Sequence, residues 1–173
     1  MAISVNADGE VIVRAPLFTG DREIRRFAER HLDWIERQRQ KADRLSEQKK
    51  NTSVLTETEL KALASEAKKD FSARAAFYAG IIGVSYGRIT IRHQKSKWGS
   101  CSSKGNLNFN CLLMFAPENV RDYIVVHELC HRKWMNHSPA FWKEVKRAMP
   151  DYNTAKRWLK EHGEELMLRN PSR

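Results

Sequence analysis

The hydrophobic period of the chain changes three times, and this limits the possible folds more than any other feature of the sequence. Apolar residues alternate with polar ones near the N-terminus, recur with helical spacing over residues 21–80, and alternate again over residues 88–113. Helical spacing returns after Pro117. Since strands and helices occupy separate stretches, the sequence predicts an α+β fold in which helices pack on a small antiparallel sheet.

The first fifty residues are predicted to form a β-hairpin and one long helix. Asp8-Gly9, a dipeptide that favours a tight hairpin turn, is flanked by the alternating residues Ile3, Val5, Val11 and Val13. An apolar stripe from Ile24 to Leu45 predicts the helix, and the polar residues 46–54 predict a loop. We expect a single domain over residues 1–173, with residues 1–50 as its N-terminal part and 55–173 as the part that carries the chemistry.

A second helix is predicted from Thr56, which can form a capping box with Glu59, to Gly80, a suitable residue to end it. The alternation over 88–93 and 106–113 predicts two strands. A turn at Lys104-Gly105-Asn106 and a further short strand or bulge at 98–101 complete the sheet. Two more helices are predicted near the C-terminus, through Phe141-Trp142-Val145 and Trp158-Leu159.

The composition excludes several classes of protein. With 41% hydrophobic and 30% charged residues, the chain is unlike a disordered or fibrous protein. Its longest apolar-or-glycine run, residues 75–84, is about half of the ~20 residues that a membrane-spanning helix needs. The N-terminus lacks a secretory signal, so we expect a cytoplasmic protein in which Cys101, Cys111 and Cys130 stay thiols.

The positive charge of the chain is concentrated in its middle third. The sequence has 31 Lys and Arg against 21 Asp and Glu, a net charge of +10. Residues 71–117 contain no Asp or Glu, but they contain Arg74, Arg88, Arg92, Lys95, Lys97 and Lys104. This distribution favours an anionic substrate or partner, without indicating whether it is a peptide, a nucleotide or a nucleic acid.

The segment His127-Glu128-Leu129-Cys130-His131 is predicted to lie within a helix that begins near Pro117. Four residues separate the two histidines, so both imidazoles lie on one helical face and can bind a single zinc ion. Glu128 then points toward the side of the metal where a water molecule binds, as a general base does. The apolar surroundings of the motif favour this interpretation over two surface histidines.

His137 is the candidate for the third metal ligand. We expect Asn136 to end the helix in a left-handed conformation and Ser138-Pro139 to begin the next helix, so that the chain reverses at His137. Three histidines with a fourth position open are typical of catalytic zinc, although imidazoles accept other divalent ions. A purely structural zinc site is the weaker alternative, because such sites usually include cysteine, whereas Cys130 is predicted to pack in the core.

A long segment of the chain consists of the run IRHQKSKWGSCSSKGNLNFNCLLMFAPENVRDYIVVHELCHRKWMNHSPAFW, followed by Met149-Pro150-Asp151-Tyr152. This segment resembles the YgjP-like metallopeptidase family, which is related to the SprT-like zinc proteases. The N-terminal segment VRAP and Trp34-Ile35 are also similar to that family. The resemblance implies that His127, His131 and His137 bind the metal and that Glu128 is the general base. These are the residues that the spacing selects.

Three functions are consistent with this sequence. The first is a zinc-dependent metallopeptidase, in which Glu128 activates a zinc-bound water and a peptide pairs with the strand of residues 106–113 as a sheet edge. The second is a nucleoside triphosphate pyrophosphohydrolase that uses the same site, and the third is a DNA-associated, SprT-like protease. The candidate substrate-binding residues, which would stabilise the developing negative charge, are Arg92, Lys95, Lys97 and Tyr152.

Overall fold

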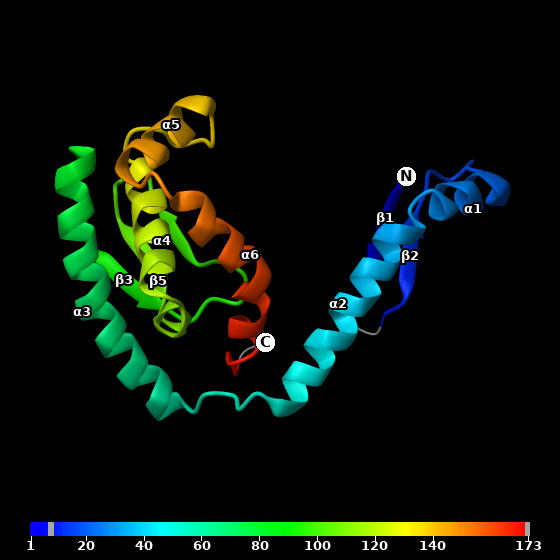
Figure 1. Cartoon of the computed structure of the whole chain (residues 1–173), viewed down its shortest axis with the longest axis horizontal. Helices are drawn as coiled ribbons and strands as arrows, with labels where there is room; N and C mark the ends of the chain where they lie inside the picture. The colour runs from blue at the N-terminus through cyan, green and yellow to red at the C-terminus, as the bar shows by residue number, and fades with distance from the viewer. Residues whose placement is uncertain (7–8, 172–173) are drawn as a thin grey trace. The chain divides into compact units, whose positions relative to one another are not determined.

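The computed structural model describes residues 1–6 and 9–171, which form two compact units, Met1–Thr52 and Ser53–Arg173. Figure 1 shows the secondary structure of each unit. In the described part of the chain, no helix is both long and apolar enough to cross a bilayer.

The first unit contains the predicted hairpin, formed by β1 (Ala2–Val5) and β2 (Val11–Arg14), which pair antiparallel with Ile3 opposite Val13. In the predicted turn, Gly9 has a φ of +79° and Asp8 lies outside the described residues. Two helices follow, α1 (Asp21–Glu29) and α2 (Leu32–Asn51). The prediction of one continuous helix was wrong, because the chain leaves helical geometry at His31, whose φ is −115°.

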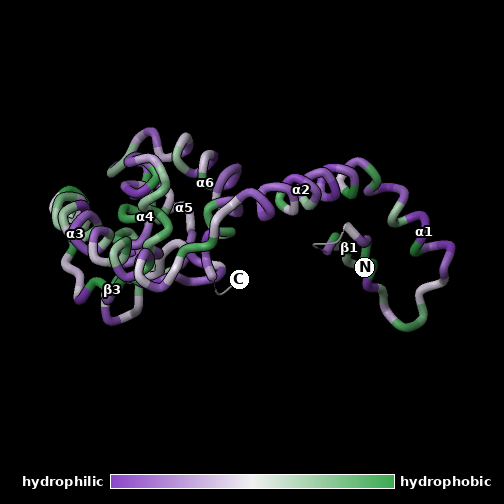
Figure 2. Tube along the Cα trace, turned by 90° about the horizontal axis from the view of Figure 1, so that it is seen from below, coloured by the Kyte–Doolittle hydropathy of each residue, from purple (hydrophilic) through white to green (hydrophobic). Residues whose placement is uncertain are grey.

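The predicted loop at 46–54 was only partly correct, since α2 continues to Asn51 and the loop begins at Thr52. The last residues of this helix include Glu47, Lys49 and Lys50, which favour helices even where apolar periodicity is lost. Figure 2 colours most of α2 as hydrophilic, and Ile35 is its buried residue.

The second unit begins with α3 (Glu57–Ile82), whose first turn has the predicted capping box between Thr56 and Glu59. The helix passes through Gly80 and ends at Gly83, which adopts the left-handed conformation with a φ of +74°. The helix therefore ends at Gly83 and not at Gly80, the predicted end. The C-terminal cap has a positive φ, and it is this conformation that requires glycine. One stripe of α3 is buried, made of Leu60, Ala67, Phe71, Ala75, Ala79 and Ile82.

The sheet of this unit is mixed, so the prediction of an antiparallel sheet was only partly correct. Its strands are β3 (Ile89–Arg92), β4 (Gly99–Cys101) and β5 (Leu107–Asn110), in the order β3-β5-β4. β4 and β5 form an antiparallel hairpin, whereas β3 and β5 are parallel. The chain reverses direction after β3 and again after β4, so β5 runs parallel to β3 and antiparallel to β4. β5 lies between these two strands.

The strand predicted over residues 106–113 is shorter than expected and central in the sheet, so it offers no free edge to a peptide. Asn110 ends it by accepting a hydrogen bond from the Leu112 backbone N–H at 3.1 Å. The chain then forms the short 3-10 helix η1 (Cys111–Phe115). The free edges belong to β3 and β4.

Three helices complete the second unit, namely α4 (Glu118–Cys130), α5 (Pro139–Ala148) and α6 (Tyr152–Met167). Figure 1 shows α4 between α3 and α6, and α4 also contacts α5 and β4. Its apolar residues Val120, Val125, Val126 and Leu129 are fully buried. The helix that carries the HELCH segment is therefore the central element of the core.

Candidate metal centre

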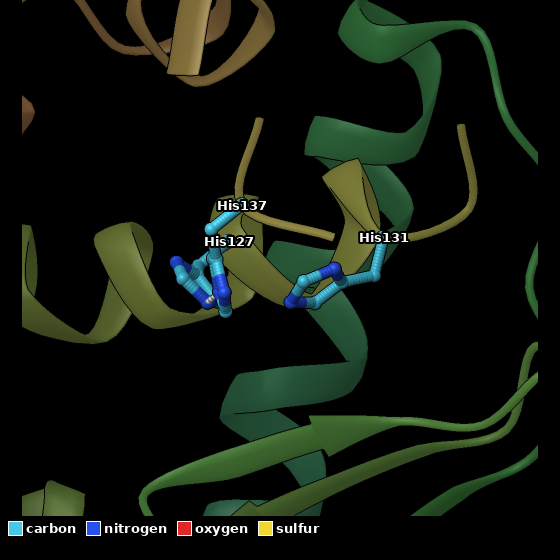
Figure 3. A group of neighbouring side chains, drawn as sticks. All are labelled: His127, His131 and His137. Atoms are coloured by element: carbon cyan, nitrogen blue, oxygen red, sulfur yellow. Dashed lines mark hydrogen bonds between the residues drawn. The ribbon is translucent and has the colours of Figure 1, made fainter. Parts of the chain in front are cut away.

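Three histidines from two neighbouring segments lie together at the end of α4. The candidate ligand atoms of His127, His131 and His137 all lie within 4.8 Å of one another. Nε2 of His127 and Nε2 of His137 are 3.0 Å apart. Figure 3 shows the three rings pointing toward one another.

The end of α4 determines this arrangement. His127 lies in the last turn of the helix and His131 is its C-terminal cap, so both project from one face. Two tight turns then reverse the chain, with hydrogen bonds from the N–H groups of Arg132 and Lys133 to the carbonyls of Leu129 and Cys130.

His137 follows this reversal and immediately precedes α5. Ser138 is the N-cap of α5 and Pro139 its first residue, as predicted. The expected left-handed Asn136 was wrong, because glycines are the only described residues with positive φ. The helix already ends at Cys130, so ordinary turns achieve the reversal without a residue in strained geometry.

Aromatic side chains of α5 support the three imidazoles. Phe141 is fully buried, and its ring centroid is 4.9 Å from His127, 4.7 Å from His131 and 4.9 Å from His137. Trp142 stacks on His137 at 5.8 Å with an interplanar angle of 27°. Packing against these rings restricts the rotamers of the histidines and so keeps their nitrogens converged.

Two of the three histidines, His127 and His131, have lowered pKa values, which favour the neutral form that binds metals. Burial, reinforced by His131 and His137, lowers the pKa of His127 to about 3. Burial also lowers the pKa of His131. The Nδ1–H of neutral His131 donates to the Trp134 carbonyl at 2.9 Å, which leaves its Nε2 lone pair free.

Glu128 follows His127 in α4 and is buried, with 5% of its surface exposed and its carboxylate close to Gly99 of β4. Burial raises the pKa of its carboxyl group to about 8, against the opposing charge of Lys97. Within the described residues, Oε2 of Glu128 has no hydrogen-bond partner. A bound cation nearby would lower this pKa and favour the carboxylate.

The donor set fits a zinc ion. Two nitrogens at about 2.0–2.1 Å from a tetrahedral ion are roughly 3.4 Å apart, close to the 3.0 Å between His127 and His137. Three imidazoles leave one position of a tetrahedral ion open for water or substrate. The cysteines contribute no ligand to it, since Cys111 and Cys130 are buried elsewhere in the core and Cys101 is half-buried in β4.

The structure brings two of the four candidate substrate-binding residues toward this centre. The Lys97 charge acts on Glu128, and the Tyr152 ring stacks on Tyr123, which contacts His127. Arg92 ends β3, on the opposite side of the sheet from β4, and Lys95 is exposed in the loop after it. Neither of these two makes a described hydrogen bond, ion pair or ring contact with the histidines.

Sequence reasoning missed several residues around the site. Tyr123 and Trp142 surround the histidines, and the Lys156 ammonium lies 4.0 Å above the Trp142 ring. A signal was present, because Tyr123 lies four residues before His127, and Lys156 lies four residues after Tyr152.

Asn110 is another residue whose role the sequence did not reveal. The alternation placed it on the polar face of its strand, yet it is fully buried. Its Nδ2 donates to the carbonyls of Gln94 at 2.9 Å and Lys97 at 3.0 Å. Asn110 thereby fixes the backbone of the loop that delivers Lys97 and β4 to Glu128.

Comparisons with known proteins show what this chain is similar to. The chain is similar to the crystal structure of the metallopeptidase zymogen abylysin of Pyrococcus abyssi, with 24% identity and a TM-score of 0.48 over 53% of this chain and 93% of that one. It is also similar to the metallopeptidase zymogen jannalysin of Methanocaldococcus jannaschii, with 23% identity and a TM-score of 0.47 over 54% of this chain and 97% of that one. A search of the curated proteins gives no match.

The family model described as "YgjP-like, metallopeptidase domain" matches residues 1–62 and 46–162 of the chain. These ranges include both the N-terminal hairpin and the three histidines. They also include the segment whose motifs resemble that family. The chain therefore belongs to the YgjP-like metallopeptidase domain family.

Proposed function

We propose that this protein is a zinc-dependent metallopeptidase in which His127, His131 and His137 hold the metal and Glu128 is the general base. The observation that supports this most strongly is the convergence of three imidazoles at the end of α4, the helix that also carries the buried carboxyl group of Glu128, whose Oε2 has no described hydrogen-bond partner. When bound, zinc would supply Lewis acidity, lowering the pKa of a water molecule toward neutrality and polarising a carbonyl group.

Glu128 moves the proton in this reaction. Its Oε2 takes a proton from the attacking water, and the new C–O bond forms at the peptide carbonyl carbon. The C–N bond then breaks, and Glu128 returns the proton to the leaving amine. The lack of a hydrogen-bond partner for Oε2 supports this role, because a carboxylate held by other donors has a lower proton affinity.

Two of the predicted residues can stabilise the negative charge that develops on the carbonyl oxygen. Lys97 approaches from the loop that Asn110 holds, and Tyr152 approaches from the first turn of α6. Either side chain would donate a hydrogen bond that strengthens as the charge grows. Arg92 and Lys95 are weaker candidates for this function, because the described contacts do not connect them to the histidines.

We propose that β4 binds the peptide, in place of the strand that the sequence suggested. β4 is an edge strand and packs against α4, and the Glu128 carboxylate lies close to Gly99 at its start. An extended peptide can add to such an edge through backbone hydrogen bonds. This would place one of its carbonyl groups near Glu128.

The substitution Glu128→Gln tests the proposed base. It removes the proton acceptor but keeps the shape of the side chain, so we expect one zinc ion per chain to remain bound while hydrolysis of a casein-derived peptide mixture falls by about 10²–10⁴-fold. Metal content is measured by elemental analysis and hydrolysis by mass spectrometry of the products. Unchanged hydrolysis would show that another residue is the base.

The substitution His137→Ala is the companion variant, because it tests the metal site. It should lose both zinc and activity, whereas Glu128→Gln loses only activity. Nucleoside triphosphates, tested in parallel, address the alternative pyrophosphohydrolase. If the zinc-loaded protein releases pyrophosphate and cleaves no peptide, the peptidase proposal is wrong.

A further inference from the structure

An aromatic stack extends from the three histidines toward the surface of the second unit. His137 stacks on Trp142 of α5, and Trp142 stacks on Tyr152 of α6 at 5.7 Å with an interplanar angle of 22°. Tyr152 also stacks on Tyr123 of α4. Three helices thus contribute to one aromatic surface that begins at the proposed metal site.

A lysine ammonium lies over this surface. Lys156 is one helical turn after Tyr152 on α6, and its Nζ is 4.0 Å from the centroid of the Trp142 ring. Lys156 is exposed, and among the residues that the structure describes no carboxylate forms an ion pair with it.

This arrangement suits the binding of an anion. The contact with Trp142 restricts the ammonium to one place, and the N–H donors that face away from the ring remain available to a ligand. From the two ring contacts, Nζ lies within about 10 Å of the His137 ring, a distance that about three residues of extended peptide span. A group bound by Lys156 would therefore lie two or three residues from the bond that is cut.

We infer that Lys156, held over Trp142, is a specificity residue that binds a carboxylate of the substrate two or three residues from the scissile bond. This inference rests on the proposed peptidase function. The carboxylate is either the C-terminus of a short peptide or the side chain of an acidic residue within a longer one. Both have the same chemistry, and the choice between them is an outcome of the test.

The test compares matched peptides on the zinc-loaded full-length protein. One pair has a free C-terminal carboxylate or its amide two residues beyond the cleaved bond, and the other has an internal Glu or Gln at that distance. We expect at least one acidic peptide to have a kcat/KM about tenfold higher than its neutral partner. A tenfold difference is the size of effect that one charge-assisted hydrogen bond produces. Lys156→Met should reduce that ratio to about one, and Lys156→Glu should reverse it.

Lys160→Met is the matched control, because Lys160 is also exposed on α6, one turn further along. It should keep the wild-type ratio, and Lys156→Arg should retain a preference for the acidic peptide. The inference is overturned if the wild-type protein has the same kcat/KM for the acidic and the neutral peptide of each pair. It is also overturned if the Lys156→Met variant keeps the preference for the acidic peptide. Circular dichroism of each variant excludes loss of fold as the cause.

A binding measurement separates this inference from the proposed function. Trialanine and trialanine amide are titrated into zinc-loaded Glu128→Gln, and the change in tryptophan fluorescence gives the two dissociation constants. Tighter binding of the acid, lost in the additional variant Lys156→Met, supports the subsite even if no peptide is hydrolysed. Equal binding of acid and amide by both proteins excludes a C-terminal carboxylate as the group that Lys156 binds, and equal binding of the matched internal Glu and Gln peptides as well contradicts the subsite, whatever the hydrolysis assays show.

Discussion

The close approach of Glu128 to β4 depends on a glycine. A Cβ atom on Gly99 would lie 2.7 Å from Oε1 and 2.8 Å from Cγ of Glu128, shorter than van der Waals contact allows. Because α4 packs on β4 and Glu128 is buried, the carboxylate has little room to move aside. The absence of a side chain at residue 99 therefore sets where the proposed base lies.

The substitution Gly99→Ala should displace the carboxylate without removing a metal ligand. A displacement of about 1 Å is enough to lower kcat/KM by roughly 10²-fold, so we expect a loss of this order with zinc binding retained. Peptide hydrolysis and metal content measure the two effects. The control is Gly80→Ala, where the added Cβ has no neighbour within 4 Å and activity should stay at the wild-type level. Full activity of Gly99→Ala would argue against Glu128 as the base.

At this scale, the sequence predicts the residues that are held by local geometry. The four-residue spacing of His127 and His131 is a property of any helix, so the prediction that they approach each other needed no tertiary information. Phe141 and Lys156 are different, because the contact of Phe141 with the histidines and that of Lys156 with Trp142 depend on how α5 and α6 pack. Periodicity indicates that such residues belong to helices but not what they contact.

At the scale of elements, an ionic network joins α5 to the turn after α4 and to the end of α3. Glu144 of α5 accepts hydrogen bonds from Lys133 at 2.8 Å and Arg147 at 2.7 Å. These two cations also donate to the carbonyls of Ile82 and Ile81, respectively, in the last turn of α3. Glu144 therefore positions the two cations that hydrogen-bond to the last carbonyl groups of α3.

This network predicts a pH-dependent contribution to stability. Hydrogen bonds from Arg147 and Lys133 lower the pKa of Glu144 to about 2, against the opposing effect of burial. Since the pKa of the folded state lies below the ordinary value of 4.5, the stabilisation is complete above about pH 4.5 and is lost as the pH falls toward 2. Glu144→Gln should lower the free energy of unfolding by about 1–3 kcal/mol at pH 7.

Urea unfolding of the metal-free proteins at pH 7, 4 and 3 tests this expectation, because removal of zinc keeps metal loss from contributing to the result. The difference between wild type and Glu144→Gln should shrink as the pH falls. Glu57→Gln, in an ion pair whose two side chains are 76% and 82% exposed, is the control and should change stability by less than about 0.5 kcal/mol. A difference that grows toward low pH would contradict the assignment.

The sheet shows why element order is harder to predict than element type. Alternation identifies β3 and β5 as strands, but the same pattern fits parallel and antiparallel partners. The insertion of β5 between β3 and β4 depends on contacts between distant segments, such as the hydrogen bonds from Asn110 to Gln94 and Lys97. The predicted peptide-binding edge was misplaced for this reason.

At the scale of the whole molecule, the two units differ in how much apolar surface they bury. The fully or nearly fully buried hydrophobic residues of the second unit come from α3, the sheet, η1, α4, α5 and α6. In the described part of the first unit, Ile35 is the single buried hydrophobic residue, and Leu17 and Phe18 are 93% and 97% exposed. The three histidines and Glu128 all belong to the second unit.

These differences predict that residues 53–173 fold and bind zinc without the first 52 residues. The fragment keeps the complete core, so it should unfold cooperatively in urea and bind one zinc ion per chain. A fragment of residues 1–52 should show no cooperative transition, since one buried side chain supplies only about 2–3 kcal/mol of the stabilisation that ordering fifty residues requires. Circular dichroism and elemental analysis of both fragments provide the measurements. An unfolded 53–173 fragment would mean that the first unit contributes to the stability of the metal centre, and a cooperative 1–52 fragment would mean that the hairpin and α2 are more stable than their burial indicates.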